Sequence, residues 1–252
     1  MPSHGMIFLH TLILLVMPLG GGQKTVEKPW TNLIGTEALA AWNAKGDWQE
    51  VGDVTLDPAN EKRLKPQTGK GVLWNGPNGR SPNLVTKQSY GDIELHVEFL
   101  IPKKSNSGVK FNSQYEIQIL DSYGVEKPKG SDCGGIYPRA ELAPKYHYLD
   151  EGTPPLTNAA KPAGEWQTLD VIFLAPRFDA DGKKIANAKF VKAVLNGKLI
   201  HVNVEQATPT GHAWPNKEKS AAPILLQGDH GPVAFRNIRV RPYVPPAEKA
   251  KP

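Results

Sequence analysis

The chain is short of cysteine: Cys133 is the single cysteine among its 252 residues. One thiol can form neither an internal disulfide bond nor a cysteine-based zinc site, which excludes a disulfide-stapled scaffold and a zinc finger. The sequence also lacks a nucleotide-binding loop, an H-E-x-x-H motif and a G-x-S-x-G motif. Cys133 lies in a glycine-rich segment without an adjacent base, so we do not expect it to be a nucleophile.

Clustered positive charge is absent as well. The sequence has 30 Lys and Arg against 25 Asp and Glu, which gives a net charge of +5, and the cations are scattered among the anions. Nucleic-acid binding needs a basic face or stripe. We therefore expect no nucleic acid among the partners of this protein.

Residues 6–19 form the one long apolar run. This run is shorter than the roughly 20 residues that a membrane-spanning helix needs, and it fits the hydrophobic region of a secretory signal peptide. We expect a signal peptide at residues 1–22, a linker at 23–29, and a periplasmic or secreted mature protein without stable membrane insertion. The first residues carry no Lys or Arg, so an uncleaved membrane anchor and a wrongly assigned start codon stay open as alternatives.

Turn-forming residues are abundant, with 24 Gly and 23 Pro. They separate short β-forming runs, of which residues 83–102 contain the clearest alternation of apolar and polar side chains. Further runs occupy residues 48–57, 70–76, 107–112, 114–121, 165–176, 187–197, 198–205, 222–231 and 232–242. Many short strands with turns between them predict an all-β sandwich or barrel, here as one domain over residues 30–243 with a flexible tail at 244–252.

Local signals add detail to this pattern. The dipeptide Asn196-Gly197 predicts a hairpin, and the runs 107–112 and 114–121 predict another. Thr36 is expected to cap a short helical turn over residues 37–41, and no helix longer than two turns is expected. Residues 122–164 form a long Gly- and Pro-rich loop, and a loop of this length in a compact domain is often functional.

Polar side chains recur inside the predicted strands. They are Glu94, His96 and Glu98 in one strand, Glu116, Gln118 and Asp121 in a second, Gln227, Asp229 and His230 at the end of a third, and Arg236 in a fourth. Rows of carboxylates, amides and imidazoles suit the hydroxyl groups of a sugar, which need both donors and acceptors. If one sheet face is concave, these residues predict a carbohydrate site there.

The same residues allow a plainer interpretation. The outward polar residues of a one-sided antiparallel sheet are its solvated face, which we favour for Glu94 and His96. The pair Asp229-His230 also suits a turn, and Arg236 suits a structural partner for a buried carboxylate.

Five segments, in order along the chain, resemble the bacterial 3-keto-disaccharide hydrolase domain. They are the tryptophan-bearing entry segment (30–42 with 46–56), the acidic strand with its N-S-G turn (90–111), the Y-E-x-Q-x-x-D strand (115–121), the segment with P-A-G-E-W (158–173) and the C-terminal LQGDHGPVAFRNIRVRP (226–242). The resemblance implies a concanavalin A-like jelly-roll β-sandwich of two antiparallel sheets with long loops. It also implies a secreted hydrolase or lyase acting on 3-keto glycosides. Residues 144–156 depart from the family pattern.

The chemistry of such substrates suggests roles for individual residues. A 3-keto group acidifies the C2 hydrogen, so a base can remove it, the enolate can expel the group on C1, and water can add afterwards. We expect Glu116 or His230 to be the base. We expect Arg236, or a cation such as calcium held by Glu98 and Asp121, to stabilise the enolate. The sequence contains no calcium-loop motif, and no other cofactor is expected.

Substrate contacts are expected from further side chains. Gln118 and Gln227 are expected to orient sugar hydroxyls, and Glu98, Tyr137 and Asn106 are additional candidates for binding the substrate. Two other functions stay open: a non-catalytic carbohydrate-binding module of lectin-like fold, and an ordinary glycosidase. Laminarinase-type glycosidases use an E-x-D-x-x-E strand, whereas the comparable strand here reads E-I-Q-I-L-D, which makes direct hydrolysis of plain glycosides the less favoured interpretation.

Overall fold

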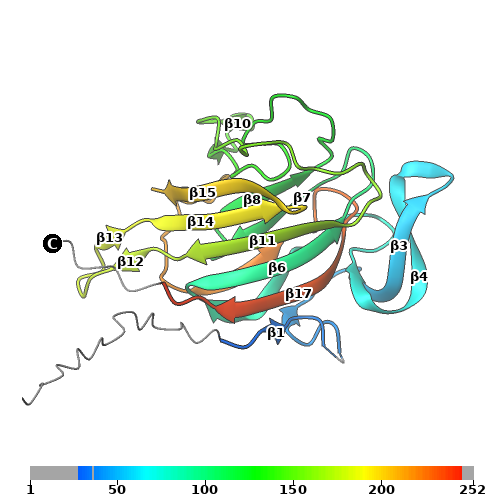
Figure 1. Ribbon diagram of the computed structural model, residues 1–252, viewed down its shortest axis with the longest axis horizontal. Coiled ribbons are helices and arrows are strands. Elements are labelled where there is room, and N and C mark those ends of the chain that lie inside the picture. The colour runs from blue at the N-terminus through cyan, green and yellow to red at the C-terminus, as the bar shows by residue number, and fades with distance from the viewer. Residues whose placement is uncertain (1–27, 36, 246–252) are drawn as a thin grey trace, which may run out of the picture.

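The computed structural model describes residues 28–35 and 37–245, which form two layers of strands (Figure 1). The expected signal peptide at residues 1–22 and the expected cap at Thr36 lie outside the described residues. Residues 23–27 of the expected linker and 246–252 of the expected tail lie outside them as well. Export of the mature chain therefore stays a prediction.

The larger sheet contains eight strands in the order β15-β14-β11-β6-β17-β4-β3, and β1 pairs with β17. Its strands are β1 (Thr31–Asn32), β3 (Gln49–Asp57), β4 (Asn60–Trp74), β6 (Ile93–Leu100), β11 (Gln167–Leu174), β14 (Ala188–Leu195), β15 (Lys198–Gln206) and β17 (Ala234–Pro242).

The smaller sheet contains five strands in the order β2-β5-β16-β7-β8. Its strands are β2 (Trp42–Asn43), β5 (Leu84–Tyr90), β7 (Asn106–Phe111), β8 (Tyr115–Leu120) and β16 (Ala222–Leu226). Two short hairpins lie outside both sheets: β9 (Ala140–Glu141) with β10 (His147–Tyr148), and β12 (Arg177–Phe178) with β13 (Lys184–Ala186). The paired strands run antiparallel, so the expected jelly-roll-type sandwich of two antiparallel sheets is confirmed.

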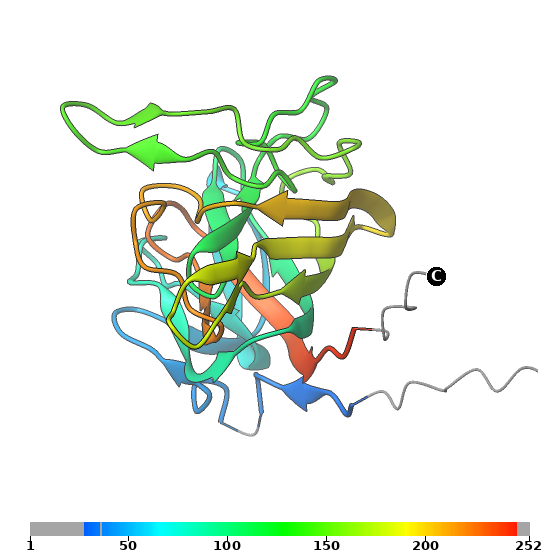
Figure 2. The ribbon, with the colours of Figure 1, turned by 90° about the vertical axis from the view of Figure 1, so that its left-hand side faces the viewer.

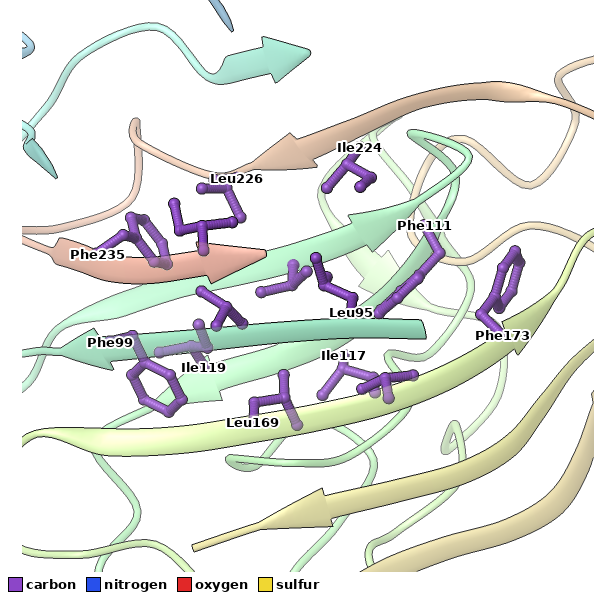
Figure 3. Packing of buried hydrophobic residues seen from close by; sticks show 14 of the residues in the cluster. Leu95, Phe99, Phe111, Ile117, Ile119, Leu169, Phe173, Ile224, Leu226 and Phe235 are labelled. Carbon is purple, nitrogen blue, oxygen red and sulfur yellow. The ribbon is translucent and has the colours of Figure 1, made fainter. Parts of the chain in front are cut away.

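The core lies between the two sheets (Figure 3). Alternate residues of β6, such as Leu95 and Phe99, face alternate residues of β8, Ile117 and Ile119, and all four are at most 1% exposed. Burying a side chain of this size stabilises the fold by about 1.5–3 kcal/mol. Because side chains alternate along a strand, the residues between these apolar ones must lie on the outer faces of the sheets.

The hairpin predictions are confirmed. Asn196 and Gly197 join β14 to β15 with φ angles of 51° and 77°, the left-handed conformation that a two-residue hairpin turn requires. Strands β7 and β8 pair in register from Asn106↔Leu120 to Phe111↔Tyr115. This second hairpin forms one edge of the smaller sheet and supplies four of the residues that line the candidate site.

Two expectations about strand boundaries are wrong. Strand β4 begins ten residues earlier than expected, at residue 60 instead of 70, and with β3 forms the arm on the right of Figure 1. Its first half is almost wholly exposed, so no apolar alternation marked it in the sequence. The run 83–102 is also not one strand, because the chain crosses at Gly91-Asp92 from β5 in the smaller sheet to β6 in the larger one.

The expected helical turn at residues 37–41 is a short turn with backbone bonds from Ala40 N to Glu37 O and from Trp42 N to Leu39 O. The described part of the chain contains no α-helix, in agreement with the expectation of none longer than two turns. Accordingly, no helix in residues 28–35 and 37–245 has the length and apolar character of a membrane span.

Candidate active site

A pocket of about 380 Å³ lies on the outer face of the smaller sheet. Strand β8 directs Ile117 and Ile119 into the core and Glu116 and Gln118 to the opposite face, as period-two alternation requires. The pocket is lined by Asn106 and Lys110 of β7, Glu116 and Gln118 of β8, Tyr137, Tyr146 and Tyr148 of the long loop, Gly211 and His212, and Gln227 and His230.

The 122–164 loop covers β8. Its backbone pairs with the strand through bonds from Gln118 N to Gly135 O, from Gly134 N to Gln118 O and from Tyr137 N to Glu116 O, each 2.8–3.0 Å long. The buried Nε2 of His201 on β15 lies 2.7 Å from Gly134 O and ties the loop to the larger sheet. Because the loop covers the strand, Glu116 and Gln118 are only 3% exposed although they point away from the core.

Glu116 forms an ion pair with Lys110, its register partner on β7, with 3.0 Å between Oε2 and Nζ. Burial raises the pKa of the Glu116 carboxyl above its ordinary value, and the positive charge of Lys110 opposes this rise. The imidazoles of His230 and His212, when charged, act in the same direction as Lys110. Glu116 is therefore a buried carboxylate that is more basic than an exposed one and is in direct contact with the ammonium group of Lys110.

Gly108 makes room for this carboxylate. It lies on β7 opposite Gln118, and a Cβ at position 108 would overlap Oε1 of Glu116. The absence of a side chain at residue 108 thus allows Glu116 to lie flat against the neighbouring strand.

Two histidines stand at the rim of the pocket. His230 follows β16, is half exposed, and has its Nδ1 2.6 Å from Oδ1 of Asp229. His212 is exposed on the segment that follows β15. The Oγ1 of Thr210, two residues earlier, accepts a hydrogen bond from Glu116 N and donates one to Gln114 O, so it fixes this segment to β8.

Amide side chains complete the polar lining. Oε1 of Gln227 is buried and has no hydrogen-bond partner within the described part of the chain, whereas Oε1 of Gln118 accepts from Ile119 N. A buried acceptor without a partner is costly in an empty protein and favours a ligand that donates a hydrogen bond. Asn106 and Gln227 thus line the pocket together with Gln118 and Glu116, as expected from the sequence.

Three tyrosines form one wall. The hydroxyl of Tyr137 lies 2.9 Å from that of Tyr146 and 3.0 Å from that of Tyr148, and the rings of Tyr137 and Tyr148 meet edge to face. Burial raises the pKa of Tyr137 and of Tyr146, so both phenols stay neutral at physiological pH and keep a hydroxyl that can donate a hydrogen bond. Tyr146 and Tyr148 come from the β9–β10 hairpin, which extends beyond the two sheets (Figure 2).

The structure does not bring Arg236 and Glu98 to this pocket. Both lie on the outer face of the larger sheet, where Nε of Arg236 is 2.7 Å from Oε2 of Glu98 and Nδ2 of Asn237 donates to Oε1. Although burial acts in the opposite direction, the hydrogen bonds from Asn237 and Arg236 hold the pKa of the Glu98 carboxyl below its ordinary value. Arg236 is thus the structural partner of Glu98. The expectation that Arg236 stabilises the enolate is wrong, because Arg236 does not line the pocket.

The expected cation site does not form from its expected ligands. Glu98 is occupied as described, and Asp121 lies after β8, where its Oδ2 accepts a hydrogen bond from Lys104 N. Across residues 28–35 and 37–245, no three His, Cys, Asp or Glu side chains gather as a metal-binding group. Glu98 and Asp121 therefore do not fit a shared calcium ion, and Asp121 is not part of the pocket lining.

The other polar residues of β6 belong to the solvated face, the interpretation favoured from the sequence. Nδ1 of His96 lies 2.7 Å from Oδ1 of Asp170, and Glu94 pairs with Arg241. These contacts run across β11, β6 and β17, so they link neighbouring strands on the outside of the larger sheet.

Five lining residues were missed in the sequence: Lys110, Tyr146, Tyr148, Gly211 and His212. Lys110 lies on the same face of β7 as Asn106 and Gly108, because every second residue of a strand shares a face, and this spacing was the signal that could have revealed it. The tyrosines lie within residues 144–156, whose sequence carries no recognisable motif, and His212 follows a strand end by six residues.

A larger groove, of about 640 Å³, lies beside the β12–β13 hairpin. Its cations are neutralised, because Arg177 pairs with Asp92, and Lys184 and Lys189 pair with Glu218 and Glu205. These three cations of the groove therefore already have carboxylate partners and are not held ready for an anionic ligand.

The fold and the pocket define an antiparallel β-sandwich domain whose smaller sheet carries carboxylate, amide, imidazole and phenol groups in one depression, a set of groups that suits sugar hydroxyls. Residues 29–241 match the model of the family described as 3-keto-alpha-glucoside-1,2-lyase-like domain. The chain belongs to this family, and the resemblance found in the sequence is confirmed. No curated protein matches the chain.

Solved structures agree with this assignment. A candidate glycosyl hydrolase from Parabacteroides distasonis is 26% identical with a TM-score of 0.58, and the match covers 90% of this chain and 100% of that one. A second candidate glycosyl hydrolase from the same organism is 22% identical with a TM-score of 0.54, over 86% of this chain and 100% of that one, and shows the fold alone. The family and the first relative together support a carbohydrate-related function.

Proposed function

We propose that this protein cleaves the glycosidic bond of 3-keto-glycosides and 3-keto-disaccharides by removing the C2 proton, expelling the group on C1 and then adding water. The observation that carries the proposal is the placement of Glu116, a buried carboxylate held against a cation in a pocket that can bind hydroxyl groups. Family membership supports the same substrate class.

Glu116 is the general base in this reaction. Burial raises its pKa, and a more basic carboxylate removes a proton from carbon more readily, while the positive charge of Lys110 favours the ionised form. His230 stands at the open rim with Asp229 behind it, where it can give a proton to the oxygen that leaves C1. The reaction thus needs no oxocarbenium ion and no second carboxylate.

Hydroxyl recognition falls to the amides and phenols of the pocket. Oε1 of Gln227 accepts a hydrogen bond from a sugar hydroxyl, and Tyr137, Gln118 and Asn106 are placed to orient others. A site built to bind a hydroxyl rejects an analogue that lacks it, since its buried group is then left without a partner.

The proposal is tested by incubating the purified protein with a 3-keto glucoside and, in parallel, with the unoxidised glucoside. We expect turnover of the 3-keto glucoside alone, and a loss of at least about 10²-fold in kcat for Glu116→Gln, the usual contribution of a general base. Glu94→Gln is the matched control, because Glu94 lies on the outer face of the other sheet. Inactivity of the wild-type protein on both glucosides, or full activity of Glu116→Gln, would contradict the proposal.

A non-catalytic carbohydrate-binding module is the competing function. A binder has no use for a basic buried carboxylate, so Glu116→Gln would keep its affinity for sugar. Calorimetry that finds affinity for the 3-keto glucoside without any product, and equal affinity in Glu116→Gln, would establish binding in place of catalysis.

A further inference from the structure

Lys110 and Glu116 face each other across the β7–β8 hairpin. They are register partners on the outer face of the smaller sheet, and their charged atoms are 3.0 Å apart. The side chain of Lys110 is 12% exposed and that of Glu116 4% exposed, so the pair lies at the bottom of the pocket and not at its rim.

Removal of a proton beside a carbonyl requires two groups at neighbouring atoms. The base must reach the hydrogen on C2, and a donor must reach the oxygen on C3, where the negative charge develops. Because C2 and C3 are bonded to each other, the base and the donor must be near neighbours as well. The contact between Glu116 and Lys110 meets this requirement.

The other polar groups are less suited to hold the C3 oxygen. Arg236 is on the other sheet, paired with Glu98. His230 is half exposed and bonded to Asp229, and the hydroxyl of Tyr137 lies between the hydroxyls of two other tyrosines. Lys110 is the cation in direct contact with the carboxylate.

We propose, resting on the reaction assigned above, that Lys110 is a catalytic residue whose ammonium group donates a hydrogen bond to the C3 carbonyl oxygen and stabilises the enolate. The C2–H bond breaks and its proton passes to Glu116. The electron pair forms the C2–C3 double bond, and the carbonyl π electrons move to the C3 oxygen beside Lys110.

In the second step the C3 carbonyl re-forms and the C2–C3 pair moves to C1–C2. The C1–O bond breaks, and the leaving oxygen receives a proton from His230. Water then adds its oxygen to C1, with a proton returned to C2 from Glu116 and one taken up by His230, which restores both residues.

The test uses Lys110→Cys in the full-length protein. Cys133 is the only native thiol, is buried, and has its pKa raised to about 11 by that burial, so alkylation is directed to the thiol introduced at position 110. 2-Bromoethylamine restores an ammonium group at nearly the native length, and iodoacetamide adds a neutral group as the matched control. Exchange of the C2 hydrogen in D₂O and release of the C1 group are both followed by NMR, and wild type treated with each reagent is the reference.

We expect Lys110→Cys to lose about 10²–10³-fold in both exchange and cleavage, the range seen when one oxyanion donor is removed. Treatment of Lys110→Cys with 2-bromoethylamine is expected to raise both rates at least 10-fold. Treatment with iodoacetamide, which adds a neutral group, is expected to raise neither. A Lys110→Cys protein that keeps the wild-type exchange rate, or equal recovery with both reagents, overturns the role of Lys110 while the proposed function stands.

A wild-type protein that neither exchanges nor cleaves overturns the proposed function itself. If Lys110→Cys does not fold, Lys110→Arg and Lys110→Gln decide the question. Lys110→Arg, which keeps a positive charge, is expected to exchange the C2 hydrogen at least 10-fold faster than the neutral Lys110→Gln. Equal exchange rates in these two variants, when both are folded, overturn the proposal.

Discussion

Glu116 and Glu98 are both outward-facing strand residues in contact with a cation, yet their surroundings give them opposite properties. Glu98 binds Arg236 and Asn237 through its two oxygens, and its pKa is lowered. Glu116 is buried beneath the 122–164 loop beside Lys110, and its pKa is raised. A carboxylate that is stabilised by two donors is a poor base, whereas one that is desolvated is a better one.

Gly108→Ala tests the room made for this carboxylate. The added Cβ would overlap Oε1 of Glu116, so the carboxylate must move. A displacement of about 1 Å in a catalytic group can lower the rate by roughly 10²-fold, and we expect a loss of this order in kcat on a 3-keto glucoside. Gly35→Ala is the control, because a Cβ there meets no atom within 4 Å. Unchanged kcat in Gly108→Ala would contradict the packing described for Glu116.

At the scale of elements, the strand faces were predictable from the sequence and the sheet membership was not. Alternation is local, so the pairing of Glu116 with Gln118 and of Glu94 with His96 on common faces follows from spacing alone. The crossing at Gly91-Asp92 sends β6 to the larger sheet, whereas β8 lies in the smaller one. Long-range pairing decides this, and no spacing rule shows that Glu98 and Glu116 lie on opposite outer faces.

The 122–164 loop is a second element whose position could not be read from its composition. Its Gly and Pro content predicted a loop, but its place over β8 depends on backbone bonds at residues 134, 135 and 137 and on the contact with His201. The tyrosine wall follows from this position, which explains why residues 144–156 contribute to the site without any motif.

His201 makes the attachment of this loop dependent on pH. Burial lowers the pKa of His201 below its ordinary value, so the unfolded chain takes up a proton first as the pH falls. The stabilisation from neutral His201 is present above about pH 6.5 and is lost as the pH drops through the folded-state pKa. The loss is about 1.4 kcal/mol for each pH unit by which the folded-state pKa lies below the unfolded-state pKa.

We therefore expect wild type to lose thermal stability and amide protection at Gly134 and Gly135 between pH 8 and pH 5. His201→Gln keeps a donor for Gly134 O without titrating, and its stability should change less over the same range. Hydrogen exchange and melting temperatures of the two proteins provide the comparison, and parallel pH profiles would show that His201 does not control the loop.

At the scale of the whole molecule, the sandwich has no internal disulfide bond to stabilise it, since the sequence has one cysteine. Cys133 is 1% exposed, and burial raises the pKa of its thiol to about 11. We expect a thiol reagent at pH 8 to label the native protein at least about 10³-fold more slowly than the urea-unfolded chain, because labelling requires an opening reaction. Reductant should leave the melting temperature unchanged, and full labelling of native protein within minutes would contradict the burial of Cys133.

The backbone bonds between the 122–164 loop and β8 also have a consequence for how this domain can be altered. β8 is the last strand of the smaller sheet, and an uncovered last strand offers its amide and carbonyl groups to other molecules. The loop forms hydrogen bonds with those backbone groups and also contributes residues to the pocket. The same loop thus covers the edge of β8 and shapes the proposed substrate site. Replacing the whole loop to change substrate preference would expose the edge of β8 and promote aggregation. Exchanges confined to the tip of the β9–β10 hairpin would leave this edge covered.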